Sequence, residues 1–299
     1  MVKTTGKPAK TGRLETGWWS FDHSFIGRTG RIGLPLYLII EIHGPKGSGK
    51  TTLASSLASK IRANGTVEYC DLESQDSEYI STIMENQGFT GTIDWISEDR
   101  DEDILDKLAA LMGNEETSAG ILDSIGAISP IAERESSLAD ANMGRRAKLM
   151  AGFTRKVTNQ LRNRESPASL FMLNHQLAAI GWTGTITPGG TVKDFMDGVK
   201  LKIKIDEKFD DGSYTLKLTV EKNRMGKSLL ESHLFMLSGM GVHTGMTAVI
   251  DCVALKLAEA KRTISLNGTS YGYMKNLIGY ADVGDPEPFL PFIKALEGK

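Results

Sequence analysis

The sequence predicts an α/β fold: a mainly parallel, twisted sheet with helices on both faces, plus an antiparallel extension. Two observations predict it. Short apolar runs alternate with amphipathic segments of helical period over much of the chain, and polar and apolar residues then alternate from residue 199 onward. The 299 residues, 40% hydrophobic and 24% charged, suit one large α/β domain with small appendages.

The apolar runs and helical patterns give an order of elements. The predicted strands are residues 38–43, 66–71, 92–97, 120–124 and 169–174. The predicted helices are residues 51–63, 77–86, 101–112 and 142–163. Antiparallel strands are expected at residues 199–207, 213–221 and 229–237, then a helix at 247–261 and a final segment near 289–296.

Three parts of the chain differ in composition. Residues 1–16 are polar and basic, and we expect a flexible arm. Residues 17–261 form the predicted core, and residues 262–299 a short C-terminal segment. Within the core, residues 176–190 are rich in Gly, Thr and Pro and too long for an ordinary turn, so they are either a functional loop or disordered.

Charge and cysteine content exclude several classes of protein. The net charge is −2, so a nucleic-acid partner would have to be held by a local patch. Only Cys70 and Cys252 are present, which argues against a disulfide scaffold and fits a reducing compartment. No apolar run is long enough to span a bilayer, so we expect a cytoplasmic protein without a membrane partner.

A complete phosphate-binding loop of the form G-x-x-x-x-G-K-[ST] lies between the first predicted strand and helix. It comprises Gly44, Pro45, Lys46, Gly47, Ser48, Gly49, Lys50 and Thr51. Glycines let the backbone N–H groups point inward around phosphates at the helix N-terminus. Lys50 can reach the β- and γ-phosphates, and Thr51 can offer its hydroxyl to Mg²⁺.

Polar residues at other strand ends suit the remaining parts of such a site. Asp123 ends an apolar run and is the candidate that holds Mg²⁺. Glu73, two residues past Asp71, is the candidate that polarises the attacking water, although a strand-end Glu can equally be solvated or a cap. Asn174 can sense the γ-phosphate, or it can simply end its strand by bonding local backbone.

An ordered series of segments resembles the bacterial RecA recombinase family over roughly residues 16–260. Leu34-Pro35 and Glu41-Ile42, ahead of the loop, are similar to its G-L-P and V-E-I. Asp71-Leu72-Glu73 resembles its D-A-E, and Asp123-Ser124 lies in a segment similar to its V-D-S-V-A-A-L-T-P. The resemblance implies a RecA-type P-loop NTPase core, and the short terminal segments fit a compact, divergent or phage-encoded member.

The resemblance implies roles for residues around ATP and Mg²⁺. Glu73 is the implied catalytic base, and Lys50 is a second implied catalytic residue. Thr52 joins the residues of the loop in binding the nucleotide. Asp76 and Tyr79 fall about where the family holds adenine. Asn174 would be the γ-phosphate sensor, and His175 stands where the family usually has Gln.

The resemblance also implies DNA contacts and contacts between subunits. The implied DNA-binding residues are Met143, Lys148, Arg155, Ile180, Gly181, Trp182, Gly189 and Gly190. Lys148 and Arg155, seven apart on one helical face, can also be an ordinary solvated face. Lys222 and Arg224 match the K-N-K whose cations reach the ATP of a neighbouring subunit, although they can equally be a charged hairpin end.

The leading hypothesis is an ATP-dependent recombinase that binds single-stranded and duplex DNA, forms a helical filament and hydrolyses ATP when DNA stimulates it. A ring helicase or branch-migration ATPase is the alternative, because Lys222-Asn223-Arg224-Met225-Gly226 also resembles their K-N-R-x-G. Two cysteines cannot form the four-thiolate zinc site that such proteins often carry. A regulatory ATP-binding protein that assembles without remodelling DNA is a third hypothesis, and a small-molecule kinase is the least favoured.

Overall fold

A nine-stranded sheet organises the protein. The computed structural model describes residues 11–129, 143–175, 177–178, 185–186, 198–282, 284–297 and 299. The central strands are parallel: β3 (Ile39–Gly44), β7 (Ser169–His175), β6 (Thr117–Asp123), β4 (Thr66–Asp71) and β5 (Thr92–Ile96), in that spatial order. On the other side of β3 lie β10 (Val199–Lys208), β11 (Tyr214–Asn223), β12 (Leu230–Leu237) and β13 (Gly241–Val242). The predicted fold class is confirmed.

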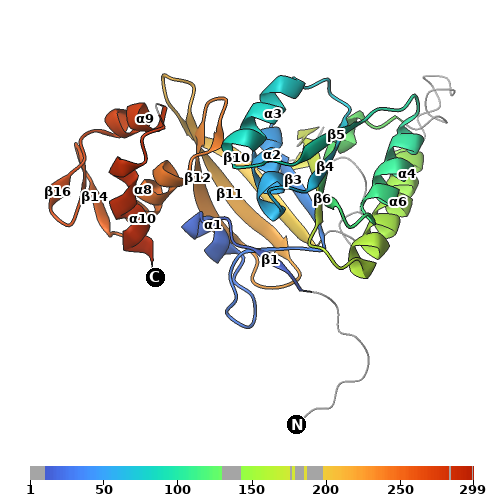
Figure 1. Ribbon diagram of the computed structural model, residues 1–299, viewed down its shortest axis with the longest axis horizontal. Helices are drawn as coiled ribbons and strands as arrows, with labels where there is room; N and C mark the ends of the chain where they lie inside the picture. Colours follow the sequence, from blue (N-terminus) through green and yellow to red (C-terminus); the bar gives the residue numbers. More distant parts are fainter. Residues whose placement is uncertain are drawn as a thin grey trace, which may run out of the picture.

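Helices cover both faces of the parallel part (Figure 1). One face buries apolar side chains of α1 (Trp19–Ser24), α2 (Lys50–Ile61) and α3 (Ser77–Asn86). The opposite face buries those of α4 (Asp101–Leu111) and α6 (Met143–Asn163). In the described part of the chain, no helix is both long and apolar enough to cross a membrane.

Residues 13–16, which the sequence assigned to the N-terminal arm, pack against the core. β1 (Arg13–Leu14) pairs antiparallel with β2 (Leu34–Pro35), and Leu14 and Thr16 are buried. The Asp22 carboxylate accepts hydrogen bonds from the backbone N–H groups of Thr16 and Gly17 at 3.0 Å. Contacts between residues distant in sequence therefore anchor residues 13–16, which a compositional argument cannot detect; residues 1–10 lie outside the described residues.

The C-terminal helices pack around a core of their own. A separate apolar cluster joins β12 to α8 (Thr244–Ala254), α9 (Met274–Asp282) and α10 (Leu290–Leu296), which follows the 3₁₀ turn η2 (Glu287–Phe289). These elements form the red lobe beside the sheet (Figure 1). A small sheet of β14 (Ala258–Ala260), β15 (Ile264–Leu266) and β16 (Thr269–Ser270) completes it.

The predicted helix at 247–261 ends at Ala254, because Lys256 adopts a left-handed φ of 59° that terminates it. The predicted boundary between residues 261 and 262 falls in the turn of the β14–β15 hairpin.

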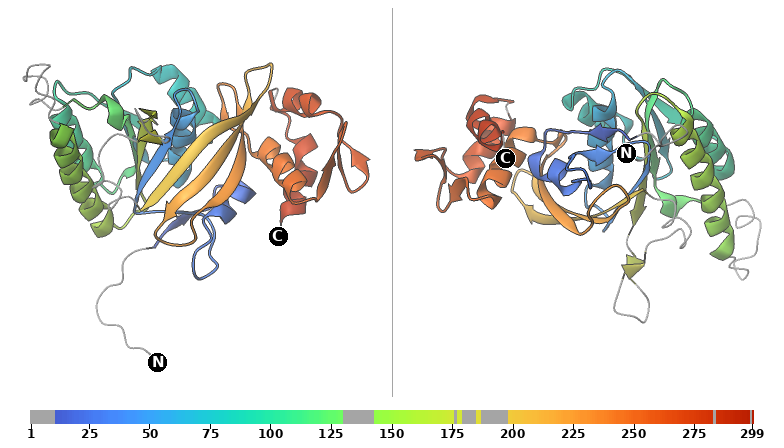
Figure 2. Two further views of the ribbon diagram at one scale, coloured as in Figure 1. Left: turned by 180° about the vertical axis from the view of Figure 1, so that it is seen from behind. Right: turned by 90° about the horizontal axis from the view of Figure 1, so that it is seen from below.

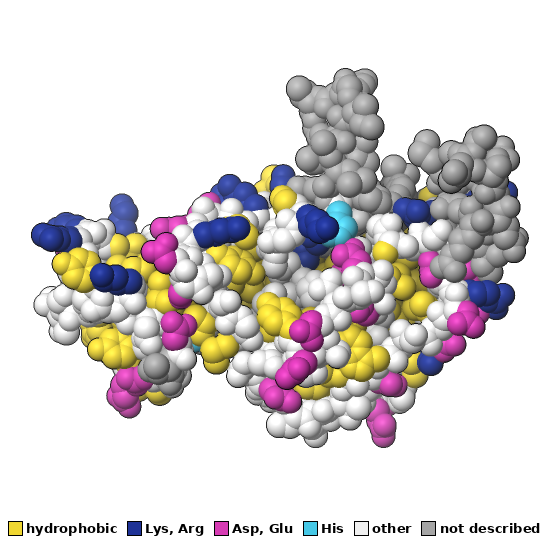
Figure 3. All heavy atoms as spheres, turned by 90° about the horizontal axis from the view of Figure 1, so that it is seen from above, with side chains coloured by type: hydrophobic (Ala, Val, Ile, Leu, Met, Phe, Trp, Pro, Cys, Tyr) yellow, Lys and Arg dark blue, Asp and Glu magenta, His cyan; other side chains and the backbone are white. Residues whose placement is uncertain are grey.

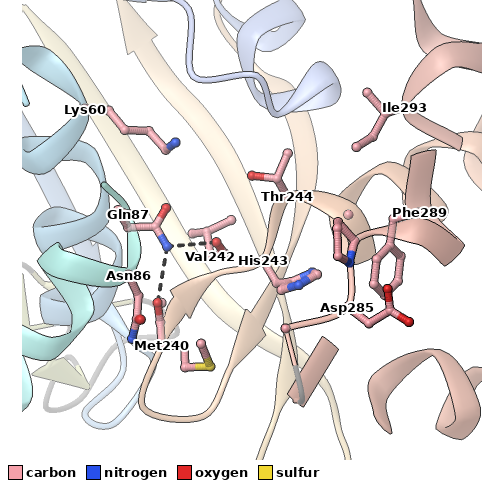
Figure 4. Close-up of a pocket in the computed structure, with 14 residues that line it drawn as sticks. Lys60, Asn86, Gln87, Met240, Val242, His243, Thr244, Asp285, Phe289 and Ile293 are labelled. Atoms are coloured by element: carbon pink, nitrogen blue, oxygen red, sulfur yellow. Dashed lines mark hydrogen bonds between the residues drawn. The ribbon is translucent and has the colours of Figure 1, made fainter. Parts of the chain in front are cut away.

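A cavity of about 310 Å³ separates this lobe from the helices of the core (Figure 4). Lys60 of α2 lines one side, and His243 and Phe289 line the other. Gln87 donates hydrogen bonds across the junction to the carbonyls of Met240 at 3.2 Å and Val242 at 3.0 Å. These bonds attach the short strand β13 to the end of α3.

Arg164 fixes the sheet edge away from the phosphate-binding loop. Its buried guanidinium donates to the carbonyl oxygens of Met112 and Ser166 at 2.9 Å, and to that of Thr117. One side chain thus joins the end of α4, the start of β6 and the turn before β7. The bonds matter because a buried carbonyl without a donor is costly.

We expect Arg164→Ala to lower the free energy of unfolding by about 3 kcal/mol or more, because several buried acceptors lose their donor at once. Urea unfolding measures the effect. Arg162→Ala is the matched control, since this exposed arginine lies in the last turn of α6, two residues before Arg164, and it should change stability by less than about 0.5 kcal/mol. Equal stability of the two variants would contradict the structural role of Arg164.

Candidate functional site

The phosphate-binding loop has the setting that the sequence predicts. The loop runs from the end of β3 into the start of α2, and its residues 46–51 line a cavity of about 300 Å³. A Cβ atom on Gly44 would lie 2.4 Å from the Ile203 carbonyl oxygen. Gly49 has a φ of 84°, and a Cβ there would lie 2.3 Å from the Tyr214 hydroxyl. Both positions therefore require glycine.

Lys50 curls back over this loop. Its Nζ donates to the carbonyl oxygens of Pro45 at 2.8 Å and Gly44 at 3.3 Å. Burial lowers the pKa of Lys50, and the charges of Asp123 and Glu73 oppose that shift. The ammonium thus lies at the loop, where it can meet phosphate oxygens.

Thr51 and Asp123 meet from different elements. The Thr51 hydroxyl donates to Asp123 Oδ2 at 2.7 Å, and the Tyr69 hydroxyl lies 3.3 Å from the same oxygen. Burial raises the pKa of Asp123 to about 6, although the bond from Thr51 opposes the shift. Within the described residues no group of three or more metal-ligating side chains occurs. A hydroxyl and one carboxylate fit Mg²⁺ that takes its other ligands from phosphates and water.

Glu73 sits between two partners at the same edge. Its Oε1 accepts a hydrogen bond from the Ser124 hydroxyl and lies 2.8 Å from His175 Nε2. Burial raises the pKa of Glu73, but the bonds from Ser124 and His175 outweigh this and lower it overall. Asp71 fixes the turn by accepting from the Glu73 N–H at 2.9 Å. The geometry keeps Glu73 ionised, as a general base requires.

Asn174 lies in the sheet behind the cavity. Its Nδ2 donates to Glu41 Oε1 at 2.8 Å, and Lys200 Nζ lies 3.8 Å from Glu41 Oε2. Asn174 is not among the side chains that line the cavity, whereas His175 is. A γ-phosphate contact by Asn174 stays a prediction.

The two predicted adenine-binding residues differ in their contacts and in whether they line the cavity. Asp76 caps α3 by accepting from the N–H groups of Glu78 at 3.0 Å and Tyr79 at 3.3 Å, and it does not line the cavity. Tyr79 does line the cavity, with its hydroxyl 3.3 Å from Thr52 Oγ1. A role of either residue in adenine binding stays a prediction.

Two residues at this site were missed by sequence reasoning. Ser124 directly follows Asp123, so its position in the motif was a signal that could have found it. Tyr214 comes from the distant strand β11 and lines the cavity beside Gly49. No local pattern marks it.

Lys222 and Arg224 lie away from the loop of their own chain. Lys222 pairs with Lys200 on β10, and Lys200 pairs with Glu41 on β3, three residues before the loop begins. Since β11 runs antiparallel to β10, Arg224 lies still farther from the loop, where its N–H donates to the Gly198 carbonyl at 3.0 Å.

The predicted DNA-binding residues fall into two groups. Lys148 and Arg155 are exposed on α6, where Arg155 Nε donates to the Ala151 carbonyl at 3.0 Å. Met143 begins α6, but its side chain is not described. The loop residues lie outside the described residues: Ile180, Gly181, Trp182, Gly189 and Gly190.

Lysines on β10 and β11 form a second cationic feature that sequence reasoning missed. Lys200, Lys202, Lys204 and Lys217 lie on the face opposite the buried Leu201 and Ile203. Seen from behind, no described helix covers these gold and orange strands (Figure 2). On the face seen from above, Lys and Arg side chains gather toward the upper edge and acidic ones toward the lower (Figure 3).

The raised pKa of Asp123 predicts a cost in stability. The folded protein holds a proton on this carboxyl more tightly than the unfolded chain does, so its contribution to stability is lost as pH rises through about 6. Asn keeps an acceptor for Thr51 without a charge. We therefore expect Asp123→Asn to raise the free energy of unfolding by about 1–3 kcal/mol at pH 8.

Urea unfolding with a chelator at pH 8 and near pH 4.5 measures this effect, which should shrink at the lower pH. Asp210→Asn is the control, since Asp210 is exposed. A gain that does not depend on pH, or no gain at pH 8, would contradict the assignment.

Comparison with known proteins agrees with this geometry. The model of the RecA N-terminal domain matches residues 8–243. The chain is 27% identical to the RecA protein of Levilactobacillus brevis over 83% of its own length and 65% of that protein. It is 28% identical to the RecA protein of Crocosphaera subtropica over 88% of its own length and 74% of that protein. The family match covers most of the chain and contains the whole phosphate-binding site, so the protein belongs to the RecA family.

Proposed function

We propose that this protein is an ATP-dependent DNA recombinase that binds single-stranded DNA as a filament and promotes homologous pairing and strand exchange. The observation that carries the proposal is the convergence of Lys50, the Thr51–Asp123 pair and the ionised Glu73 around one cavity. Membership of the RecA family supports the coupling of this site to DNA.

The residues of the site have different roles in ATP hydrolysis. Lys50 and the loop N–H groups hold the phosphates of ATP, and Thr51 and Asp123 hold Mg²⁺. When bound, Mg²⁺ neutralises charge on the phosphate oxygens. Glu73 accepts a proton from the attacking water, while Ser124 and His175 hold its carboxylate in place.

Lys222 and Arg224 complete the site of a second copy in this proposal. They lie too far along β11 to serve the loop of their own chain. Cations offered across an interface stabilise the transferring phosphoryl group only when subunits are assembled. Hydrolysis would then depend on the filament.

Two surfaces support DNA binding. The exposed Lys148 and Arg155 of α6 and the lysines of β10 and β11 supply cations that can meet phosphates, although the net charge is slightly negative. Acidic partners offset some of this charge, as Glu231 does for Lys217 at 2.7 Å. Base contacts are assigned to the segment that contains Ile180 and Trp182.

ATP hydrolysis measured with and without single-stranded DNA, together with electron microscopy, tests the proposal. We expect DNA to stimulate hydrolysis and helical filaments to form, and Lys50→Ala to abolish hydrolysis. Closed rings that unwind a fork would instead favour a helicase. Hydrolysis that is indifferent to DNA would leave only an ATP-binding protein of regulatory type.

Mixing two inactive variants tests whether the site is shared. Lys222→Ala lacks the cation offered to a neighbour, and Glu73→Gln lacks the base. In an equimolar mixture, a site works when it has its own Glu73 and a neighbour with Lys222. We therefore expect recovery to about a quarter of the wild-type rate, the fraction of interfaces with both groups intact.

Lys227→Ala, at an exposed lysine in the turn after β11, is the control and should keep the wild-type rate. Full activity of Lys222→Ala alone, or no recovery in the mixture, would argue against a shared site.

A further inference from the structure

Tyr214 brings an aromatic side chain from β11 to the phosphate-binding loop. It is the first residue of the strand, after the turn at residues 209–213. Its hydroxyl would lie 2.3 Å from a Cβ on Gly49, and its ring carbons only slightly farther away. The ring therefore packs against the backbone where the loop enters α2.

Thr52 lies next to both Tyr214 and a second tyrosine, Tyr79. Thr52 lies close enough to Tyr214 to act on the pKa of that phenol, and its Oγ1 lies 3.3 Å from the hydroxyl of Tyr79. Both phenols also line the cavity of the loop. β11, α2 and α3 thus supply one cluster of hydroxyl groups.

The cluster marks the end of the cavity opposite the reacting phosphate. Thr51 faces Asp123, whereas Thr52, about 100° farther round the helix, faces the two tyrosines. Glu73 and His175 lie on the side of Asp123. With the γ-phosphate beside these groups, the nucleoside must leave the loop on the side of Thr52.

We propose that Tyr214 is a nucleotide-binding residue whose hydroxyl bonds to the sugar of the bound nucleotide, beside a base that rests on the half-exposed ring of Tyr79. This inference rests on the proposed nucleotide-binding function. Burial and the nearby phenol of Tyr79 raise the pKa of Tyr214 to about 12, so the hydroxyl stays neutral and can both donate and accept. Tyr214 is thus specific to the nucleoside, while the loop holds phosphate.

The competing explanation is that Tyr214 only packs against Gly49. Tyr214→Phe separates the two, since it keeps the ring and removes the hydroxyl. Titration calorimetry with ADP and with inorganic tripolyphosphate measures the two halves of the site. We expect ADP to bind about 5- to 10-fold more weakly, as for the loss of one hydrogen bond, and tripolyphosphate to bind as it does to the wild type.

Tyr37→Phe is the matched control, because it removes a phenol bonded to the Glu165 carbonyl at 2.9 Å, away from the cavity. It should bind both ligands normally. Wild-type affinity of Tyr214→Phe for ADP, or equal loss for both ligands, would overturn the inference.

These measurements distinguish failure of the role proposed for Tyr214 from failure of the proposed recombinase function. If Lys50→Ala loses ADP while Tyr214→Phe does not, the nucleotide site stands and the role of Tyr214 falls. If Tyr214→Phe loses ADP but DNA leaves ATP hydrolysis unchanged, the role of Tyr214 stands and the recombinase proposal falls. A wild-type protein that binds no ADP would overturn both.

Discussion

The register of the parallel strands is the constraint on which the site depends. Gly44 pairs with His175, and Asp71 pairs with Asp123, so four strands end at one edge of the sheet. The loop, the groups proposed to hold Mg²⁺ and the proposed catalytic carboxylate all lie at or just after those strand ends. A one-residue slip would turn each of these side chains to the other face. The buried runs of β3, β6 and β7 prevent that slip because both of their faces are packed.

Two carboxylates at this edge are driven in opposite directions by their surroundings. Burial raises the pKa of Asp123 to about 6, while hydrogen bonds from Ser124 and His175 lower that of Glu73 despite its own burial. Asp123 gains most from a cation placed beside it, whereas Glu73 is already stable as an anion. The fold therefore gives two neighbouring carboxylates different pKa values, which suits the metal-binding and base roles proposed for them.

The sequence was sufficient to place the phosphate-binding loop and the strand ends, because both belong to local patterns. The loop at residues 44–51, Asp123 and Glu73 follow from the spacing of strand ends, and the five parallel strands follow from their apolar runs. It was insufficient where a residue acts across the fold. Tyr214, Arg164 and the anchoring of residues 13–16 by Asp22 depend on contacts between segments distant in the chain. The short strands of the C-terminal part were not predicted, because they carry too few residues to show a period.

Strand β11 connects the phosphate-binding loop of its own chain to the cations proposed to complete a neighbouring site. Tyr214 starts the strand at the loop of its own chain, and Lys222, one residue before the strand ends, lies toward the edge that faces away. Ten residues of strand, paired with β10 on one side and β12 on the other, span roughly 30 Å. A ligand that shifts Tyr214 must therefore strain the hairpin or move the strand, and the far end carries the cations proposed to complete a neighbouring site. The antiparallel extension is thus the element best placed to make one site depend on the state of the next.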